Sequence, residues 1–348
     1  MIRGGVFIGV KRTGGLPVLR AAASDAKTMY EWAVDPKLGG MEPQNVRLLT
    51  DANGELVTVA AVAAAVKDVV DVGVDQLILY FAGHGVMIGL NETWLLSEAP
   101  ENGNEAIDVT ACEGYAATGS TRHVVIISDA CRVPARNYET SVLRAGSVFP
   151  NKRIGNQRVD VFFSCAPAQA ALETNTTDAR GIFSEILHDA LCAVLRDVGG
   201  AETKVLEPGD PDDGARYILP EPLGAYLELA VNAQLIDMNL DIDQSPLIKT
   251  TGTTRNRRWI ARFDQGRGRE FSVRGPACDK PAPGSEVVPT VRTITQTANE
   301  LIDAAFEGRS LRPLLRSARR EGAAAFADSV EAMIEVSGRS TRALVARV

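Results

Sequence analysis

The stretch Leu77–Gly85, LILYFAGHG, and its counterpart Val124–Arg132, VVIISDACR, decide the fold of this chain. Each begins as a run of aliphatic, β-branched or aromatic residues and ends at polar ones, which is the pattern of a strand buried in a parallel sheet. Open α/β sheets place their chemistry at the carboxyl ends of such strands. If the two strands are neighbours, His84 and Cys131 meet at that edge.

Further strand-like runs flank these two, with helical patterns between them. The expected strands are Gly4–Val10, Val46–Leu49, Gln76–Ala82, His123–Ser128, Val159–Ser164 and Arg258–Phe263. Apolar residues recur at helical spacing over Ala22–Ala33, Val62–Val69 and Ile182–Val194. Alternating strands and helices predict an α/β fold, with a mostly parallel central sheet of about six strands and helices on both faces.

The composition of the chain changes toward its C-terminus. Gly275–Pro289 is rich in proline and typical of a linker, and amphipathic helical patterns follow it. We therefore expect a main domain over residues 1–270, a Pro-rich linker over 271–289 and a small helical appendage over 290–348. Within the main domain, the acidic and Pro/Gly-rich stretch Glu202–Pro222 is expected to be irregular.

The bulk composition is that of an ordinary globular protein of 348 residues, 45% hydrophobic and 23% charged. A net charge of −7 argues against general nucleic-acid binding. No apolar stretch is long enough to cross a bilayer, and the N-terminus lacks a signal-peptide pattern, so no membrane partner is expected. Five unclustered cysteines fit a reducing compartment, which predicts a cytoplasmic location.

His84 and Cys131 are the candidate catalytic pair. A thiolate is a far better nucleophile than a thiol, so an imidazole that accepts the thiol proton creates an acyl-transfer centre. Gly83 and Gly85 leave room for a peptide beside the histidine ring. The alternative is a buried structural cysteine and a hydrogen-bonded turn histidine. The position of both residues at strand ends favours Cys131 as nucleophile and His84 as general base.

This pair in its strand contexts resembles the caspase-like cysteine peptidases of the peptidase C14 type, particularly the metacaspase and paracaspase branch with its many bacterial members. The resemblance ends near Pro281 and leaves out the tail. It implies a caspase-like fold and a cysteine endopeptidase that works with a His/Cys dyad and no third member. By analogy with the family, the backbone N–H groups of Cys131 and Gly85 are the expected oxyanion donors.

The resemblance also implies a substrate pocket. Metacaspase-like enzymes hold the arginine or lysine before the cleaved bond (P1) with acidic side chains in the S1 pocket. One lies two residues before the catalytic cysteine, which is Asp129 here. Another lies in an Asn-Asp-Ala-like string, which Ser24–Ala26 matches and which makes Asp25 the second acid. A guanidinium relieves the repulsion between two such carboxylates. Glu173 is a third candidate, and a solvated helix-surface acid is the alternative for Asp25.

No cofactor is expected. The cysteines and histidines lack the spacing of a zinc site, and no Walker-type glycine loop is present. Some metacaspases need calcium, and the acidic cluster over residues 210–213 could bind it, but without EF-hand spacing a solvated loop is favoured. Cys165 also ends a strand-like run and is expected to be a pocket wall, while His123 and His188 are expected to be structural.

The sequence thus predicts a cysteine endopeptidase that cleaves after arginine, or lysine, and whose substrate is a protein. Basic residues in Arg132–Arg158, close to the nucleophile in sequence, predict self-cleavage within this loop. The resemblance further implies a role in bacterial stress or defence, with an activating protein partner bound by the helical appendage. Two other hypotheses stay open: a catalytically silent scaffold or binding module, and a thiol amidase for small substrates.

Overall fold

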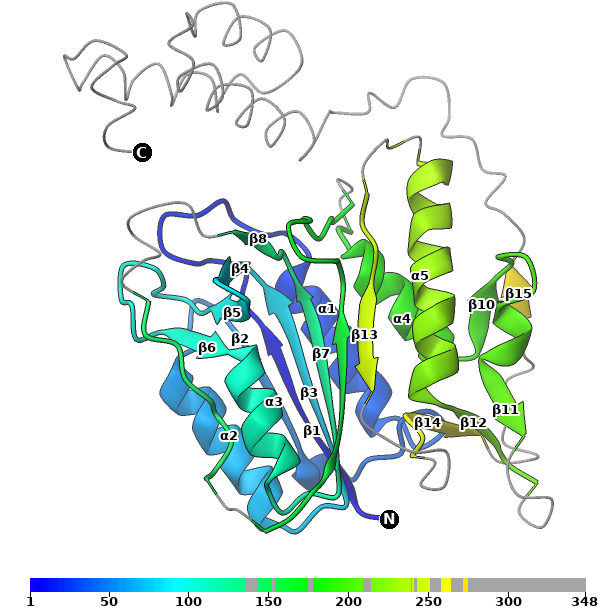
Figure 1. Cartoon of the computed structure of the whole chain (residues 1–348), viewed down its shortest axis with the longest axis horizontal. Helices are drawn as coiled ribbons and strands as arrows, with labels where there is room; N and C mark the ends of the chain where they lie inside the picture. Colours follow the sequence, from blue (N-terminus) through cyan, green and yellow to red (C-terminus); the bar gives the residue numbers. More distant parts are fainter. Residues whose placement is uncertain are drawn as a thin grey trace, which may run out of the picture. The chain divides into compact units, whose positions relative to one another are not determined.

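The computed structural model describes residues 1–134, 143–151, 154–174, 178–208, 214–238, 240, 243–250, 258–263 and 272–274 (Figure 1). All of them belong to one compact unit. The expected linker and appendage, residues 271–289 and 290–348, lie outside the described residues except for Ser272–Arg274.

A six-stranded sheet forms the centre of the described unit, in the order β13-β9-β7-β3-β1-β2 (Figure 1). Its strands are β1 (Arg3–Gly9), β2 (Val46–Thr50), β3 (Gln76–Gly83), β7 (His123–Ala130), β9 (Arg158–Phe163) and β13 (Leu247–Thr250). All neighbours pair in parallel except β13, which runs antiparallel to β9. Every residue of β3 and β7 is buried, as their apolar runs predict. The predicted α/β fold with a mostly parallel sheet is confirmed.

Helices cover both faces of this sheet (Figure 1). They are α1 (Ala22–Val34), α2 (Val59–Asp71), α3 (Val109–Ala117), α4 (Ile182–Leu191) and α5 (Pro220–Asp237). Because side chains alternate along a strand, Ile8 packs in one core with Val66 of α2. Its neighbour Phe7 instead meets Tyr30 of α1, edge to face with ring centroids 6.5 Å apart. The described part of the chain contains no helix both long and apolar enough to span a membrane.

A second sheet of four short strands, in the order β6-β5-β4-β8, lies at the carboxyl edge of the central one. It consists of β4 (Gly85–Ile88), β5 (Asn91–Leu95), β6 (Ala106–Asp108) and β8 (Val133–Pro134). Because β4 follows His84 directly and pairs in parallel with β8, which follows Cys131 closely, this sheet holds the two segments together.

Three short strands form another sheet, in the order β11-β12-β14, and β10 pairs with β15. Their bounds are β10 (Val194–Arg196), β11 (Leu206–Pro208), β12 (Arg216–Ile218), β14 (Ala261–Phe263) and β15 (Ser272–Arg274), with 3-10 turns at Pro43–Asn45 and Glu202–Lys204. The prediction that Arg258–Phe263 supplies the sixth central strand was therefore wrong. β14 pairs with β12, and the edge position is taken by β13.

The structure corrects two further expectations and adds one helix that was not predicted. Glu202–Pro222 is not irregular throughout, since it holds strands and the start of α5, whose Pro220 sits in the first turn, where proline is tolerated. The helix predicted over Ile182–Val194 ends at Leu191, because Ala193 takes a left-handed φ of 59° and β10 follows. The unpredicted helix α3 begins after Asp108, whose carboxylate caps it by accepting a hydrogen bond from a backbone N–H.

Candidate active site

His84 and Cys131 lie at the same edge of the central sheet. Gly83 of β3 pairs with Ala130 of β7, and the two residues follow these partners directly. The structure thus places the predicted base and nucleophile on the ends of adjacent parallel strands, where the chemistry of open α/β sheets is found.

Gly85 stands where the two segments approach most closely. A Cβ atom at this position would lie 2.7 Å from the carbonyl oxygen of Cys131 and 2.8 Å from the Cβ of Ala130. No larger residue fits without moving the backbone, so the glycine after the histidine is a packing requirement.

The imidazole of His84 has a partner that the sequence did not reveal. Its Nε2 atom lies 2.7 Å from the backbone carbonyl oxygen of Pro17. A carbonyl oxygen only accepts hydrogen bonds, so Nε2 carries the hydrogen of a neutral ring and Nδ1 is left to accept a proton. Burial lowers the pKa of His84, which keeps the ring neutral near pH 7. Sequence reasoning expected no third member; a main-chain carbonyl leaves no mark in the sequence.

Cys131 is held as a neutral thiol. Its Sγ atom lies 3.8 Å from the carbonyl oxygen of Ala171, a weak S–H donor contact. Burial, together with nearby carboxylates that include that of Asp129, raises the pKa of the thiol to about 11. Among the residues that the structure describes, no hydrogen bond joins this thiol to His84. The raised thiol pKa keeps the proton on sulfur at neutral pH.

Asp25 and Asp129 converge although they come from different elements, α1 and β7. A Cβ atom at Gly181 would lie 2.6 Å from Oδ2 of Asp129 and 3.0 Å from Oδ2 of Asp25, so both carboxylates surround this glycine. Only 1% of Asp25 and 8% of Asp129 is exposed. The solvated helix-surface position weighed for Asp25 is therefore wrong.

Burial raises the pKa of both acids, to about 7 for Asp25 and about 6 for Asp129. The charge of Asp129 contributes to the raised pKa of Asp25. Hydrogen bonds oppose this effect: the amide N–H of Gly181 donates to Asp25 at 2.7 Å, and the hydroxyl of Ser184 donates to Asp129. Two buried carboxylates with raised pKa values form a site that a cation stabilises.

Glu173 points at the start of α1. Its carboxylate accepts hydrogen bonds from the backbone N–H groups of Arg20, at 3.0 Å, and Ala21, at 2.9 Å. A carboxylate at this position caps the helix and favours its dipole. Glu173 thereby ties its loop to the helix that carries Asp25, and its charge raises the pKa of Cys131.

Sequence reasoning missed a buried ion pair between Arg132, which follows β7, and Glu92 of β5. The Arg132 Nε atom lies 2.7 Å from Oε2 of Glu92, without the alignment of a hydrogen bond, and the guanidinium carbon lies 4.0 Å above the ring of Phe163. The other Glu92 oxygen accepts hydrogen bonds from Ser128 and from Trp94 Nε1. Burial raises the pKa of Glu92 to about 7. The pair links the residue after the nucleophile to the hairpin after His84.

The other singled-out residues have structural surroundings. Cys165 is buried, and its thiol contacts the carbonyl oxygen of Ala130 at 3.5 Å, directly beside the nucleophile. The ring of His123 is fully buried between the amide of Gln76 and the carboxylate of Asp160, at 2.9 and 2.7 Å. The His188 ring lies beside Cys192 and Asp189 at the end of α4.

The acidic cluster weighed for calcium, Asp210, Asp212 and Asp213, lies outside the described residues. Among those that are described, no group of three or more histidine, cysteine or acidic side chains is arranged to hold a metal ion.

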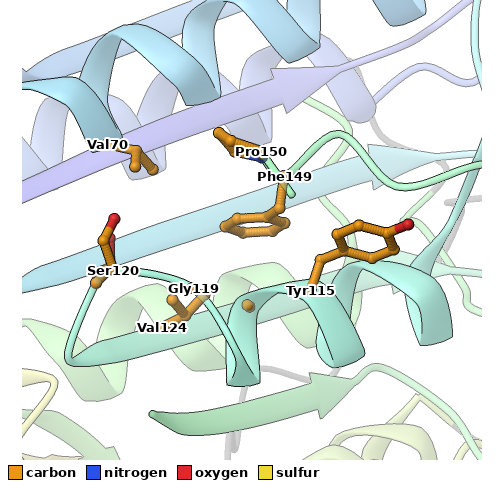
Figure 2. A pocket seen from close by; sticks show the side chains of 9 residues that line it. Val70, Tyr115, Gly119, Ser120, Val124, Phe149 and Pro150 are labelled. Atoms are coloured by element: carbon orange, nitrogen blue, oxygen red, sulfur yellow. The ribbon is translucent and has the colours of Figure 1, made fainter. Parts of the chain in front are cut away.

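A shallow pocket of about 250 Å³ of empty space lies at the other end of β7, far along the strand from Cys131 (Figure 2). Tyr115 and Phe149 present their rings to it, and Val124 contributes from the start of the strand. Its lining includes none of the predicted site residues.

Residues 5–206 match the family model described as Caspase domain. Among solved structures, the Drosophila initiator caspase Dronc aligns with 8% identity over 72% of this chain and 80% of its own, with a TM-score of 0.42. The structure of pro-sf-caspase-1 aligns with 12% identity over 71% of this chain and 90% of its own, with a TM-score of 0.41. No curated protein matches the chain.

Proposed function

The chain belongs to the caspase domain family and is a cysteine peptidase, and from this premise we propose that it is an endopeptidase that cleaves proteins after arginine or lysine. Cys131 is the nucleophile and His84 the general base. The observation that carries the specificity is the convergence of two buried carboxylates, Asp25 and Asp129, around Gly181. A pocket for an acidic P1 side chain would need cations in their place.

The proposed reaction starts from the neutral pair. His84 Nδ1 accepts the thiol proton as the Cys131 sulfur attacks the scissile carbonyl carbon, and the backbone N–H groups of Cys131 and Gly85 stabilise the oxyanion. The imidazolium then returns the proton to the leaving amine, which leaves a thioester on sulfur. Water hydrolyses the thioester, with His84 again taking a proton, and the free thiol is restored. The Pro17 carbonyl supports these steps because it keeps the hydrogen on Nε2.

The raised pKa values of Asp25 and Asp129 favour the binding of a cation in the proposed pocket. An incoming guanidinium or ammonium lowers the pKa of Asp25 and Asp129 and stabilises their charged forms. A guanidinium suits two carboxylates better than an ammonium, because its donors lie in a planar fork. Arginine is therefore the preferred P1 residue.

Fluorogenic peptides that differ only in P1, as arginine, lysine or aspartate, test the proposal. We expect the wild-type chain to cleave the arginine peptide best, Cys131→Ala to be inactive, and Asp25→Asn to lose affinity for the basic peptides. Equal turnover by Cys131→Ala would remove the nucleophile assignment. Preference for aspartate would overturn the pocket and leave the nucleophile standing. Hydrolysis of small amides but of no peptide would favour the amidase instead.

Several finer expectations stay predictions. Self-cleavage within Arg132–Arg158 concerns a stretch whose residues 135–142 and 152–153 lie outside the described part, as does the appendage that would bind an activating partner. Calcium dependence, the cytoplasmic location and a role in bacterial stress or defence likewise stay predictions. Mass spectrometry of the wild-type chain and Cys131→Ala, with and without calcium, tests self-cleavage and the metal requirement together.

A further inference from the structure

The carboxylate of Asp25 is already bound to a cation of the same chain. Arg180 donates from Nε to Oδ1 of Asp25 at 2.8 Å. The Asp25 side chain is 1% exposed, whereas that of Arg180 is 30% exposed. The pair therefore consists of a buried acid and a partner that reaches solvent. Arg180 thus already makes with Asp25 the contact that a substrate guanidinium would make in the proposed S1 pocket.

The backbone around Arg180 is fixed without help from its side chain. The N–H of Arg180 donates to Thr174 Oγ1 at 2.9 Å, and the N–H of Thr174 donates to the Arg180 carbonyl at 2.8 Å. Next to it, Gly181 pairs with Glu173 and donates its N–H to Asp25. Rotation of the Arg180 side chain away from Asp25 breaks none of these bonds. The Asp25 carboxylate can therefore lose this partner while the backbone contacts remain.

We propose that Arg180 occupies the position of the substrate's basic side chain as an internal competitor, which a basic P1 residue must displace from Asp25. The inference rests on the proposed function. Because Arg180 is tethered beside its acceptor, it competes at a high effective concentration and weakens every basic substrate. A substrate arginine can reproduce the hydrogen bond that Arg180 donates to Asp25. Because Arg180 must leave Asp25 before either basic side chain binds, it weakens arginine and lysine substrates by the same factor.

Removal of Arg180 should raise kcat/KM for basic peptides, whereas removal of a residue that supports the site should lower it. We expect Arg180→Ala to raise kcat/KM for a P1-arginine peptide about tenfold, the effect of one charge-assisted hydrogen bond at the weaker end of its range. The gain should appear as a lower KM with an unchanged kcat, and a P1-lysine peptide should gain by the same factor. Arg180→Lys should lie between Arg180→Ala and wild type.

Arg196→Ala is the matched control, because Arg196 forms a comparable pair with Asp237 at 2.9 Å, away from the site. Its kcat/KM should equal that of wild type. Thermal unfolding of each variant checks that folding is retained. A lower or unchanged kcat/KM for Arg180→Ala, with a wild-type enzyme that cleaves the arginine peptide, overturns the inference.

A binding measurement separates this inference from the proposed function. In the Cys131→Ala background, calorimetric titration with an arginine peptide reads the pocket without turnover. Tighter binding with Arg180→Ala added supports displacement, and equal binding overturns it. If no variant cleaves the peptide but Arg180→Ala still binds it more tightly, the cleavage specificity fails while the competition at Asp25 stands.

Discussion

Replacement of Arg132 by methionine should destabilise the protein by an amount that grows with pH. The substitution keeps an unbranched apolar stem of similar length and removes the cation that faces Glu92 at 2.7 Å. Both side chains are buried, at 5% and 1% exposure. Loss of one partner from a buried pair costs about 3–5 kcal/mol when the remaining charge stays ionised. Glu92 has another option, since it can take up a proton.

The pH dependence follows from the pKa of Glu92, which is about 7 in the folded protein against an ordinary value of 4.5. A carboxyl group whose pKa is raised on folding loses stability as pH rises from the unfolded to the folded pKa. In the wild-type chain this loss stops near pH 7. Without Arg132 the pKa rises further, so the loss continues above pH 7 at about 1.4 kcal/mol per pH unit. The added penalty at pH 8.5 is therefore about 2 kcal/mol relative to pH 7.

Urea unfolding at pH 5.5, 7 and 8.5 measures this effect through tryptophan fluorescence. Trp94 is a suitable reporter, because it donates to Glu92 and stacks on Phe81 with ring centroids 4.6 Å apart. The double variant Arg132→Met/Glu92→Gln is the control and should show no such slope, since no ionisable group remains in the pair. The same penalty for Arg132→Met at pH 5.5 and at pH 8.5 would refute the reasoning.

Three further predictions concern the site. Gly85→Ala should reduce kcat at least about 100-fold, because its Cβ would lie 2.7 Å from the Cys131 carbonyl oxygen and displace the catalytic pair; Gly114→Ala, which meets no atom within 4 Å, should keep wild-type turnover. The KM for P1-arginine peptides should rise as pH falls below about 7, where Asp25 takes up a proton; a flat KM between pH 8 and pH 5 would contradict the pocket. Glu173→Ala should lower the free energy of unfolding by about 1 kcal/mol through loss of the α1 cap, while Glu173→Gln, which keeps an acceptor, should cost less in urea titrations.

The parts of the fold that could be predicted are those coded by long apolar runs. β3 and β7 are buried along their whole length, and their predicted bounds are right to within two residues. Parallel topology then places His84 and Cys131 at one edge without any knowledge of side-chain contacts. The sixth strand could not be found this way. β13 has a pattern of exposed and half-buried residues, so an edge strand of this length gives no apolar run.

The site likewise contains residues that could be predicted from the sequence and contacts that could not. Asp25 and Asp129 were singled out by their positions beside recognisable strings, and the structure brings them together around Gly181. The partners of these acids were not predictable. Arg180, for example, lies 155 residues from Asp25 in the chain, and only the tertiary fold brings the two together. Likewise Arg132, between β7 and β8, meets Glu92 of β5, which lies 40 residues earlier in the chain. Such contacts depend on tertiary geometry, which spacing along the chain does not encode.

The hydrogen bond from His84 to Pro17 has a practical consequence for mutagenesis. Any amino acid at position 17 presents a main-chain oxygen, so truncation of the proline ring leaves the acceptor in place. An alanine scan would therefore pass over the group that orients the imidazole. Only a change to the main chain itself would expose its contribution. A deletion would move the carbonyl, and an ester in place of the amide would make it a weaker acceptor.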